Sequence, residues 1–350
     1  MVWQPFSKPS SAENESHRAN QSTQPKKLRR IKSVMTQSAL FQLNQISVID
    51  VTGQDANKIV HNLTTQAIQD LDDLESVESF ITDVKGKMVG HVIVMKNGEN
   101  LRLVGPSGQS SAIAAHIDRY IIREDADVSV VDDNFSALIA GKTLGARIDE
   151  QTRLPAAETT NESRMKPCSV STTMAGQPVW ITPIPWLGLG SKLILIKHSE
   201  SSDITNELVG VHNCVLRSEE DFHRERTRIG FPWFGIDLNS SNLPQEADRD
   251  SETISFTKGC YLGQETIARL DAMGQVQKKL VRWKLEGDMP SIGSTVDFND
   301  KVVGRLTSVA EFEDGIFAIG PARRSHFEPG SVGDVTDDAD QSGKTTATVL

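Results

Sequence analysis

The stretch Thr257-Lys258-Gly259-Cys260-Tyr261-Leu262-Gly263-Gln264-Glu265 places one thiol between two glycines. Glycine tolerates positive φ angles and close approach of the backbone to a partner, so these two glycines predict a tight loop that holds a side chain out. Lys258, two residues before Cys260, would favour the reactive thiolate through its charge. A lone cysteine is more often a small buried apolar residue, so the residues taken singly favour a structural role.

The composition indicates a globular protein with a substantial core. The chain has 350 residues, of which 37% are hydrophobic, and this length fits one large domain or two to three small ones. No apolar run approaches the roughly 18 residues that a membrane helix needs, which predicts a soluble protein without a membrane partner. The net charge of −10 argues against direct binding of nucleic acid through its phosphates.

The cysteines are few and widely spaced. Cys168, Cys214 and Cys260 form no CxxC pattern, so they predict neither a disulfide framework nor a self-contained zinc or iron–sulfur site. We therefore expect no metal site, and a reducing compartment such as the cytoplasm.

Both ends of the chain read as disordered. Residues 1–35 are polar and carry seven lysines and arginines against two glutamates, without the apolar segment of a secretory signal. A transit peptide, and with it an organelle matrix, is the alternative to a cytoplasmic location with a solvated basic arm. Residues 335–350 are rich in Asp, Ser, Thr and Gly and predict a second loose tail.

Residues 36–277 mix short strands and helices in an α+β order. Residues 48–51 read as a strand, and the next apolar residues (Ala56, Ile59, Val60 and Leu63) share one helical face. Asn97-Gly98 predicts a hairpin turn. The polar range 147–177, which contains Cys168, predicts a long surface loop or insertion. No GxGxxG or P-loop pattern appears, which disfavours nucleotide-binding folds.

Residues 278–334 change to strand periodicity. Val281, Trp283 and Leu285 alternate with charged residues, and further short strands follow between turns rich in Gly, Asn and Asp. This pattern predicts a small C-terminal antiparallel β-barrel.

The stretch 258–265, followed by Ala268-Arg269, resembles the signature of the folate-binding YgfZ family. That family is related to the aminomethyltransferase (T-protein) of the glycine cleavage system. Weaker similarities extend over about 36–332, namely Gly53-Gln54-Asp55-Ala56, Asp83-Val84-Lys85-Gly86-Lys87, Arg226 with Gly230-Phe231-Pro232, and Leu243-Pro244-Gln245.

The resemblance implies an α+β fold with an aminomethyltransferase-like folate-binding body over 36–277 and the small β-barrel after it. It implies tetrahydrofolate as cofactor and an accessory role in the assembly or repair of iron–sulfur enzymes, including one that modifies tRNA. The expected partners are therefore folate and iron–sulfur enzymes or their assembly proteins.

The same resemblance suggests the folate contacts. Arg226 is the candidate for the glutamate tail, since guanidinium pairs well with carboxylates, and Gln245 is a further polar contact. Trp180 and Trp186, with Trp233, are candidates for the apolar slot, although core packing is the alternative for each. Ile46 stands where the family has a folate-contacting tryptophan, which keeps open a scaffold that has lost folate.

Gly90 and His91 stand where aminomethyltransferases carry an aspartate pair. Without an acid or base beside folate, aminomethyl transfer loses its proton-handling group, so we expect no glycine-cleavage activity. The alternative is a folate-dependent one-carbon transferase that acts on an unidentified amine and uses His91 as its base.

Three roles remain open for Cys260, namely a redox-reactive thiol, a transient ligand to iron or a cluster, and a structural residue. A single thiol cannot hold a cluster alone, so cluster binding would need a partner. We favour a functional, partly exposed thiol within the motif formed by Lys258, Gly259, Cys260, Tyr261, Gly263, Gln264, Glu265 and Arg269. Gln264 is expected to hold the loop by hydrogen bonds, and Glu265 and Arg269 to pair across one helical turn.

Overall fold

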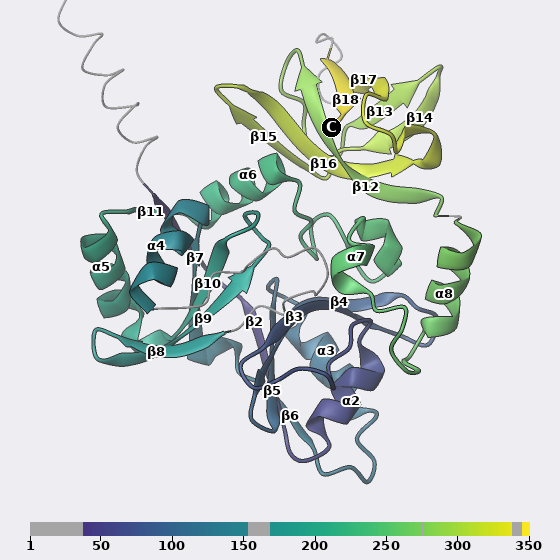
Figure 1. Cartoon of the computed structure of the whole chain (residues 1–350). Helices are drawn as coiled ribbons and strands as arrows, with labels where there is room; N and C mark the ends of the chain where they lie inside the picture. The colour runs from purple at the N-terminus through teal and green to yellow at the C-terminus, as the bar shows by residue number, and fades with distance from the viewer. Residues whose placement is uncertain (1–37, 153–168, 275, 338–344) are drawn as a thin grey trace, which may run out of the picture. The chain divides into compact units, whose positions relative to one another are not determined.

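The computed structural model describes residues 38–152, 169–274, 276–337 and 345–350 (Figure 1). The predicted basic arm at 1–35 and Cys168 lie outside these residues. No helix among the described residues is both long enough and apolar enough to cross a membrane.

A five-stranded antiparallel sheet forms the first layer of the body, in the order β3-β4-β5-β2-β6. Its bounds are β2 (Ser47–Thr52), β3 (Ser76–Thr82), β4 (Met88–Asn97), β5 (Asn100–Gly105) and β6 (Asp127–Val130). Helices α2 (Ala56–Leu63) and α3 (Ser110–Asp118) pack on it (Figure 1). The apolar face predicted for α2 is buried. The predicted hairpin between β4 and β5 is present, and its two turn residues are Gly98-Glu99, one position later than predicted.

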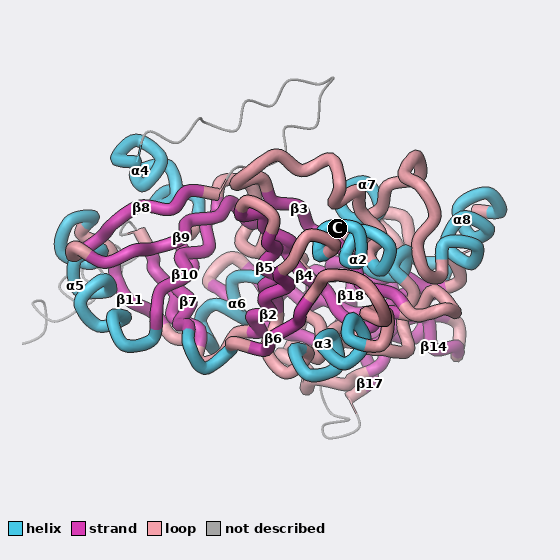
Figure 2. The backbone as a smooth tube through the Cα atoms, turned by 90° about the horizontal axis from the view of Figure 1, so that it is seen from below, coloured by secondary structure: helices cyan, strands magenta, loops and turns pink. Residues whose placement is uncertain are grey.

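A second sheet has six strands in the order β11-β1-β7-β10-β9-β8. Its strands are β1 (Ala39–Leu43), β7 (Phe135–Ala140), β8 (Val170–Met174), β9 (Gln177–Ile184), β10 (Ser191–Lys197) and β11 (Val215–Arg217). All pairs are antiparallel except β1 with β11. Helices α4 (Lys142–Thr152) and α5 (Ser201–His212) lie beside this sheet (Figure 2).

The range 147–177, predicted as a surface loop or insertion, begins within a helix and ends within a pair of strands. Helix α4 runs to Thr152, and β8 begins at Val170. This helix is hard to predict from sequence because few of its residues are apolar. Leu144 and Ile148, one turn apart, are fully buried, and most of the other residues are polar. Residues 153–168 lie outside the described part of the chain.

The C-terminal strands close into a barrel in the cyclic order β12-β18-β17-β13-β14-β16, with β15 paired to β16 as an outer hairpin. The bounds are β12 (Lys278–Glu286), β13 (Thr295–Phe298), β14 (Lys301–Arg305), β15 (Ser308–Phe312), β16 (Gly315–Arg323), β17 (Val332–Thr336) and β18 (Thr345–Val349). The alternation predicted in β12 places Val281, Trp283 and Leu285 in the barrel core.

The predicted loose tail at 335–350 is wrong where the chain is described. Strand β18 pairs with both β12 and β17, and without it the barrel would be open along two edges. Its short sequence, Thr-Thr-Ala-Thr-Val, reads as polar, yet Ala347 and Val349 are buried in the barrel. The alternation is too short to stand out within the polar stretch.

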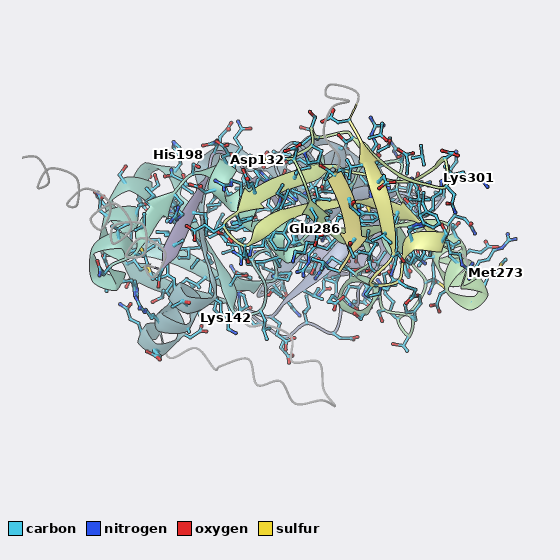
Figure 3. All side chains as sticks on the ribbon, turned by 90° about the horizontal axis from the view of Figure 1, so that it is seen from above. Asp132, Lys142, His198, Met273, Glu286 and Lys301 are labelled. Carbon is cyan, nitrogen blue, oxygen red and sulfur yellow. The ribbon has the colours of Figure 1, made fainter. Side chains whose placement is uncertain are left out.

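Helices α6 (Glu219–Ile229), η3 (Pro244–Ala247), α7 (Asp250–Thr253) and α8 (Gln264–Met273) lie between the last strand of the body and the first strand of the barrel. Three further short helices, η1 (Asp132–Asn134), η2 (His198–Glu200) and η4 (Arg324–His326), lie within the body or the barrel. Helix α6 packs on β15 and β16, and η3 packs on β12. Helix α8 ends at Met273, which is labelled in Figure 3.

Candidate functional site

The cysteine loop, residues 255–263, is bonded to the end of α2 and to β3. The Ser255 amide donates to the Thr65 carbonyl at 2.9 Å, and the Leu262 amide donates to the Asn62 carbonyl at 2.8 Å. On the other side, the Thr82 hydroxyl donates to the Leu262 carbonyl at 2.7 Å. The loop is therefore held at both ends by the first sheet and its helix.

Gly263 closes the loop against the Asp83–Lys87 turn. A Cβ on Gly263 would lie 2.5 Å from the Asp83 carbonyl oxygen and 2.6 Å from the Gly86 Cα, and its φ of +81° disfavours side chains as well. Gly86 also has a positive φ and faces the Gly263 carbonyl. Two motifs that lie far apart in the sequence thus meet backbone to backbone, which requires glycine on both sides.

Lys258 caps the end of α2. Its Nζ donates to the carbonyl oxygens of His61, Thr64 and Gln66 at 2.6, 2.8 and 2.9 Å. These carbonyls belong to the last turn of α2 and the residues after it, where backbone acceptors lack helical partners and a cation is favoured. Burial lowers the pKa of Lys258 to about 7, and the three acceptors favour its ammonium form. The sequence predicted that this charge acts on the thiol, whereas in the structure it is bonded to the carbonyls at the end of α2.

The Tyr261 ring packs against the Lys258 ammonium group. Its ring centroid lies 4.9 Å from the Lys258 Nζ, and the side chain is buried with Ile254 and Ile267. Burial raises the pKa of Tyr261 to about 12, so the ring stays neutral. This small cluster anchors the loop from which Cys260 projects.

Cys260 itself is exposed, as is Gly259 beside it. The other described cysteine, Cys214, is buried, and burial raises the pKa of its thiol. Gln264 begins α8, and Glu265 and Arg269 lie exposed on that helix one turn apart. Around Cys260, as elsewhere in the described residues, no group of three or more His, Cys, Asp or Glu side chains is arranged to hold a metal ion.

Arg226 of α6 forms a buried ion pair with Asp237, in the loop after that helix, and also contacts the barrel. Its Nη1 donates to Asp237 Oδ2 at 2.6 Å, its Nε to His223 Nδ1 at 2.7 Å and its Nη2 to the Ser308 hydroxyl at 3.0 Å. The side chain is 1% exposed. The Arg226 guanidinium, which was expected to bind the folate tail, is therefore bonded to protein groups instead.

The candidate tryptophans pack as core residues. Trp186 is 1% exposed, and its ring lies edge-on to Trp233 with centroids 5.0 Å apart. Trp180 is half-buried against Phe135, and the Arg102 guanidinium lies 5.1 Å from the Trp180 ring centroid. Ile46 joins the same apolar cluster as Trp186. These contacts favour the packing alternative for each ring.

His91 belongs to a buried chain of three charged or polar side chains. Its Nε2 lies 2.7 Å from Glu78 Oε1, and Arg249 donates to both Glu78 oxygens at 2.7 and 2.6 Å. Burial raises the pKa of Glu78, but the Arg249 charge and the His91 hydrogen bond outweigh burial and lower it to about 2. His91 is 2% exposed between the Phe80 and Phe231 rings, so this imidazole is closed to a substrate.

At Gly90, where the resemblance predicts a carboxylate in aminomethyltransferases, neighbouring side chains fill the space. A Cβ there would lie 2.4 Å from Ile113 Cδ1 and 2.8 Å from Gln109 Oε1. The Gln109 amide is fixed because it accepts from the His91 amide at 2.9 Å and donates to the His91 carbonyl at 2.8 Å. An acidic side chain at position 90 therefore has no room in this packing.

Two cavities lie near the barrel. The first, of about 330 Å³, is lined by Gln245, one of the predicted folate contacts. The second, of about 300 Å³, is lined by three cationic residues (Arg249, Lys279 and Arg282) and one acidic residue (Asp248), together with Phe327 and Leu350. The sequence did not point to Glu78 or to these cations as site residues. Glu78 could have been found, because a glutamate within an otherwise apolar strand such as β3 indicates a buried charge that needs a partner.

The chain has an aminomethyltransferase-like fold with a C-terminal barrel. Its structure is similar to the glycine cleavage system aminomethyltransferase T from Bartonella henselae, with a TM-score of 0.74 and 16% identity over 92% of this chain and 87% of that one. This likeness confirms the predicted fold class.

Among curated proteins, the chain resembles the tRNA-modifying protein YgfZ. The protein of that name from Escherichia coli O157:H7 is 23% identical over 310 residues, which cover 86% of this chain and 90% of that one. The protein from Shigella dysenteriae is 22% identical with the same coverage. No family model matches the chain. The resemblance predicted from the cysteine loop is thus confirmed over most of the sequence.

Proposed function

We propose that this protein is a tetrahydrofolate-binding accessory factor that supports the assembly or repair of iron–sulfur enzymes, including enzymes of tRNA modification. The support comes from the aminomethyltransferase-like fold and from the relatives named as tRNA-modifying proteins. One observation carries the choice of an accessory role over catalysis, namely the filled space beside Gly90.

That space supports the accessory role over the second candidate function. A one-carbon transferase needs a group that moves a proton near the folate nitrogens. Ile113 and Gln109 occupy the place of a carboxylate at position 90, and His91 is enclosed by two rings and bonded to Glu78. Neither position offers an accessible acid or base, so the amine-transferase alternative is disfavoured.

The cavity lined by Arg249, Lys279 and Arg282 fits the anionic end of folate. Lys279 pairs with Asp248 at 2.9 Å, and Arg249 pairs with Glu78, so both are partly neutralised. Arg282 makes one long bond, 3.4 Å from its Nη1 to the Ile229 carbonyl, and is therefore the best carboxylate partner. In this proposal Arg282 takes the role that the sequence analysis gave to Arg226.

Cys260 is the proposed contact with the iron–sulfur client. It is exposed on a loop whose neighbours are fixed by Lys258 and Gly263, so the thiol has a defined position. Iron–sulfur clusters are usually held by four ligands, so this thiol would supply one ligand and the client or an assembly protein the others.

Calorimetric titration with tetrahydrofolate tests the folate part of the proposal. The wild type, Cys260→Ala, Arg282→Ala and the exposed control Arg119→Ala are compared. We expect Arg282→Ala to weaken binding by roughly tenfold or more, as for a lost charge-assisted hydrogen bond, and the other two variants to bind like the wild type. A folded wild type that does not bind would refute the folate proposal.

A further inference from the structure

The cavity of about 300 Å³ lies between the body and the barrel. Its walls come from the end of α6, from η3 and the two residues after it, and from strands β12, β16 and β18 with the segment after η4. Figure 1 shows β12 on the side of the barrel that faces α6 and α7. The cavity therefore combines charged groups from both parts with apolar side chains.

Arg282 lies between two uncovered apolar side chains of this cavity. Its Nη1 donates to the Ile229 carbonyl at 3.4 Å, and its carbonyl accepts from the Leu350 amide at 2.9 Å. Ile229 is 39% exposed and Leu350 is 41% exposed, although both line the cavity. A guanidinium beside two such side chains suits a carboxylate that is attached to a flat apolar group.

Gly230 fixes the course of the Arg282 side chain. It has a φ of +93°, and a Cβ there would lie 3.1 Å from Arg282 Cδ and 3.4 Å from Arg282 Cβ. The aliphatic part of Arg282 thus packs directly on the backbone at the end of α6. A guanidinium that is held in this way loses less freedom when it binds an anion.

The other charged groups of the cavity are already paired. Lys279 Nζ donates to Asp248 Oδ1 at 2.9 Å and lies 5.0 Å from the Phe327 ring centroid. Arg249 is paired with Glu78. Among the described residues that line the cavity, Asp248 is the acidic one, so its carboxylate competes with a ligand carboxylate for Lys279.

The pterin ring of folate needs different groups. Its amino group and ring N–H are donors side by side, which a carboxylate accepts best. The carboxylate of Asp248 is occupied by Lys279, and the remaining charged groups are donors themselves. The volume of about 300 Å³ is at the lower end of the roughly 300–1,000 Å³ of ligand sites, so the cavity has room for only part of a folate.

We propose that this cavity recognises folates by their p-aminobenzoyl-glutamate half and leaves the pterin in solvent. The inference rests on the proposed function and names the part of the cofactor that is bound. Arg282 holds a glutamate carboxylate, and the p-aminobenzoyl ring packs against Ile229 and Leu350. The protein then binds folates without regard to the reduction state of the pterin.

Calorimetry with the full chain compares tetrahydrofolate, folic acid, p-aminobenzoyl-glutamate and 6-methyltetrahydropterin. The last two are the separate halves of the cofactor. The cavity variants are Ile229→Ser and Asp248→Asn. Their controls are Ile292→Ser, an isoleucine of the barrel that is 70% exposed, and Asp118→Asn, an exposed aspartate of α3. Circular dichroism and thermal melting confirm that each variant is folded.

We expect tetrahydrofolate, folic acid and p-aminobenzoyl-glutamate to bind the wild type within about threefold of one another, and 6-methyltetrahydropterin not to bind. Ile229→Ser should weaken p-aminobenzoyl-glutamate binding about fivefold or more, through lost apolar contact. Asp248→Asn should strengthen it about threefold or more, because Lys279 is freed for the ligand. Both controls should bind like the wild type.

Binding of 6-methyltetrahydropterin in place of p-aminobenzoyl-glutamate would overturn the inference. A tetrahydrofolate affinity more than about tenfold above that of folic acid would do the same, because the pterin would then be recognised. Equal effects of the cavity and control substitutions would also refute it. Each of these results leaves folate binding intact, whereas a folded wild type that binds no folate would refute the proposed function as well.

Discussion

Gly86 and Gly263 lie in backbone contact, although 176 residues of chain separate them. A Cβ on Gly263 would fall 2.6 Å from the Gly86 Cα, so the two loops can approach only because neither residue has a side chain. This contact sets the position of the cysteine loop on the first sheet.

Gly263→Ala should therefore destabilise the protein by about 2–4 kcal/mol, since it adds a steric clash to an unfavourable φ. Gly108→Ala is the matched control, because Gly108 has a φ of +86° and open space around its Cβ position. Urea denaturation measures both. Equal losses in the two variants would show that the clash with Gly86 contributes nothing.

Lys258→Met tests whether Lys258 caps α2 or activates the thiol. If the ammonium serves the three carbonyls, the free energy of unfolding falls by about 1–3 kcal/mol, and Cys260 reacts with iodoacetamide at least as fast, because its loop loosens. An exposed lysine variant, Lys85→Met, is the control. Slower alkylation without a loss of stability would instead support activation of Cys260.

Arg226→Ala should lower stability by about 3–5 kcal/mol, because it leaves the Asp237 carboxylate buried without its cation. Asp237 also accepts from the hydroxyls of Thr307 and Ser308 in the barrel, so the loss should loosen the contact between body and barrel. Limited proteolysis near residue 278 reports this loosening. If a stable, folded Arg226→Lys variant bound tetrahydrofolate more weakly, the result would indicate that Arg226 contacts folate after all.

Stability should fall with acid through Glu78. Its pKa is about 2 in the folded protein against 4.5 unfolded, so the unfolded chain binds more protons between these values. The stabilisation, about 3 kcal/mol at full extent, is present above pH 4.5 and is lost as the pH falls toward 2. Urea titrations from pH 7 to 3.5 compare wild type and Glu78→Gln. The difference between them should shrink below pH 4.5, and a constant difference would contradict the assignment.

The sequence predicted those features that rest on local pattern. The period-2 alternation around Trp283 and the one-sided apolar face of α2 located the barrel and the first helix. The glycines around Cys260 predicted a tight loop with an exposed thiol, and Gly263 has the positive φ that this loop requires.

What the sequence could not supply were pairings across long separations. Arg226 meets Ser308 across 82 positions, and Arg249 meets Glu78 across 171. A charged residue has the same local pattern whether its partner is a ligand or another part of the fold, so Arg226 was placed in the folate site. Strand β18 was missed for a related reason, because its three buried side chains show their role only once β12 and β17 flank them.

The packing around Gly90 has an evolutionary consequence. Gln109 is locked to the backbone of His91, and Ile113 is fully buried, so an aspartate at position 90 would be tolerated only after both had been replaced. Each intermediate would carry a clash or a void. The effect of an acid at position 90 therefore depends on residues 109 and 113, which makes these three positions epistatic.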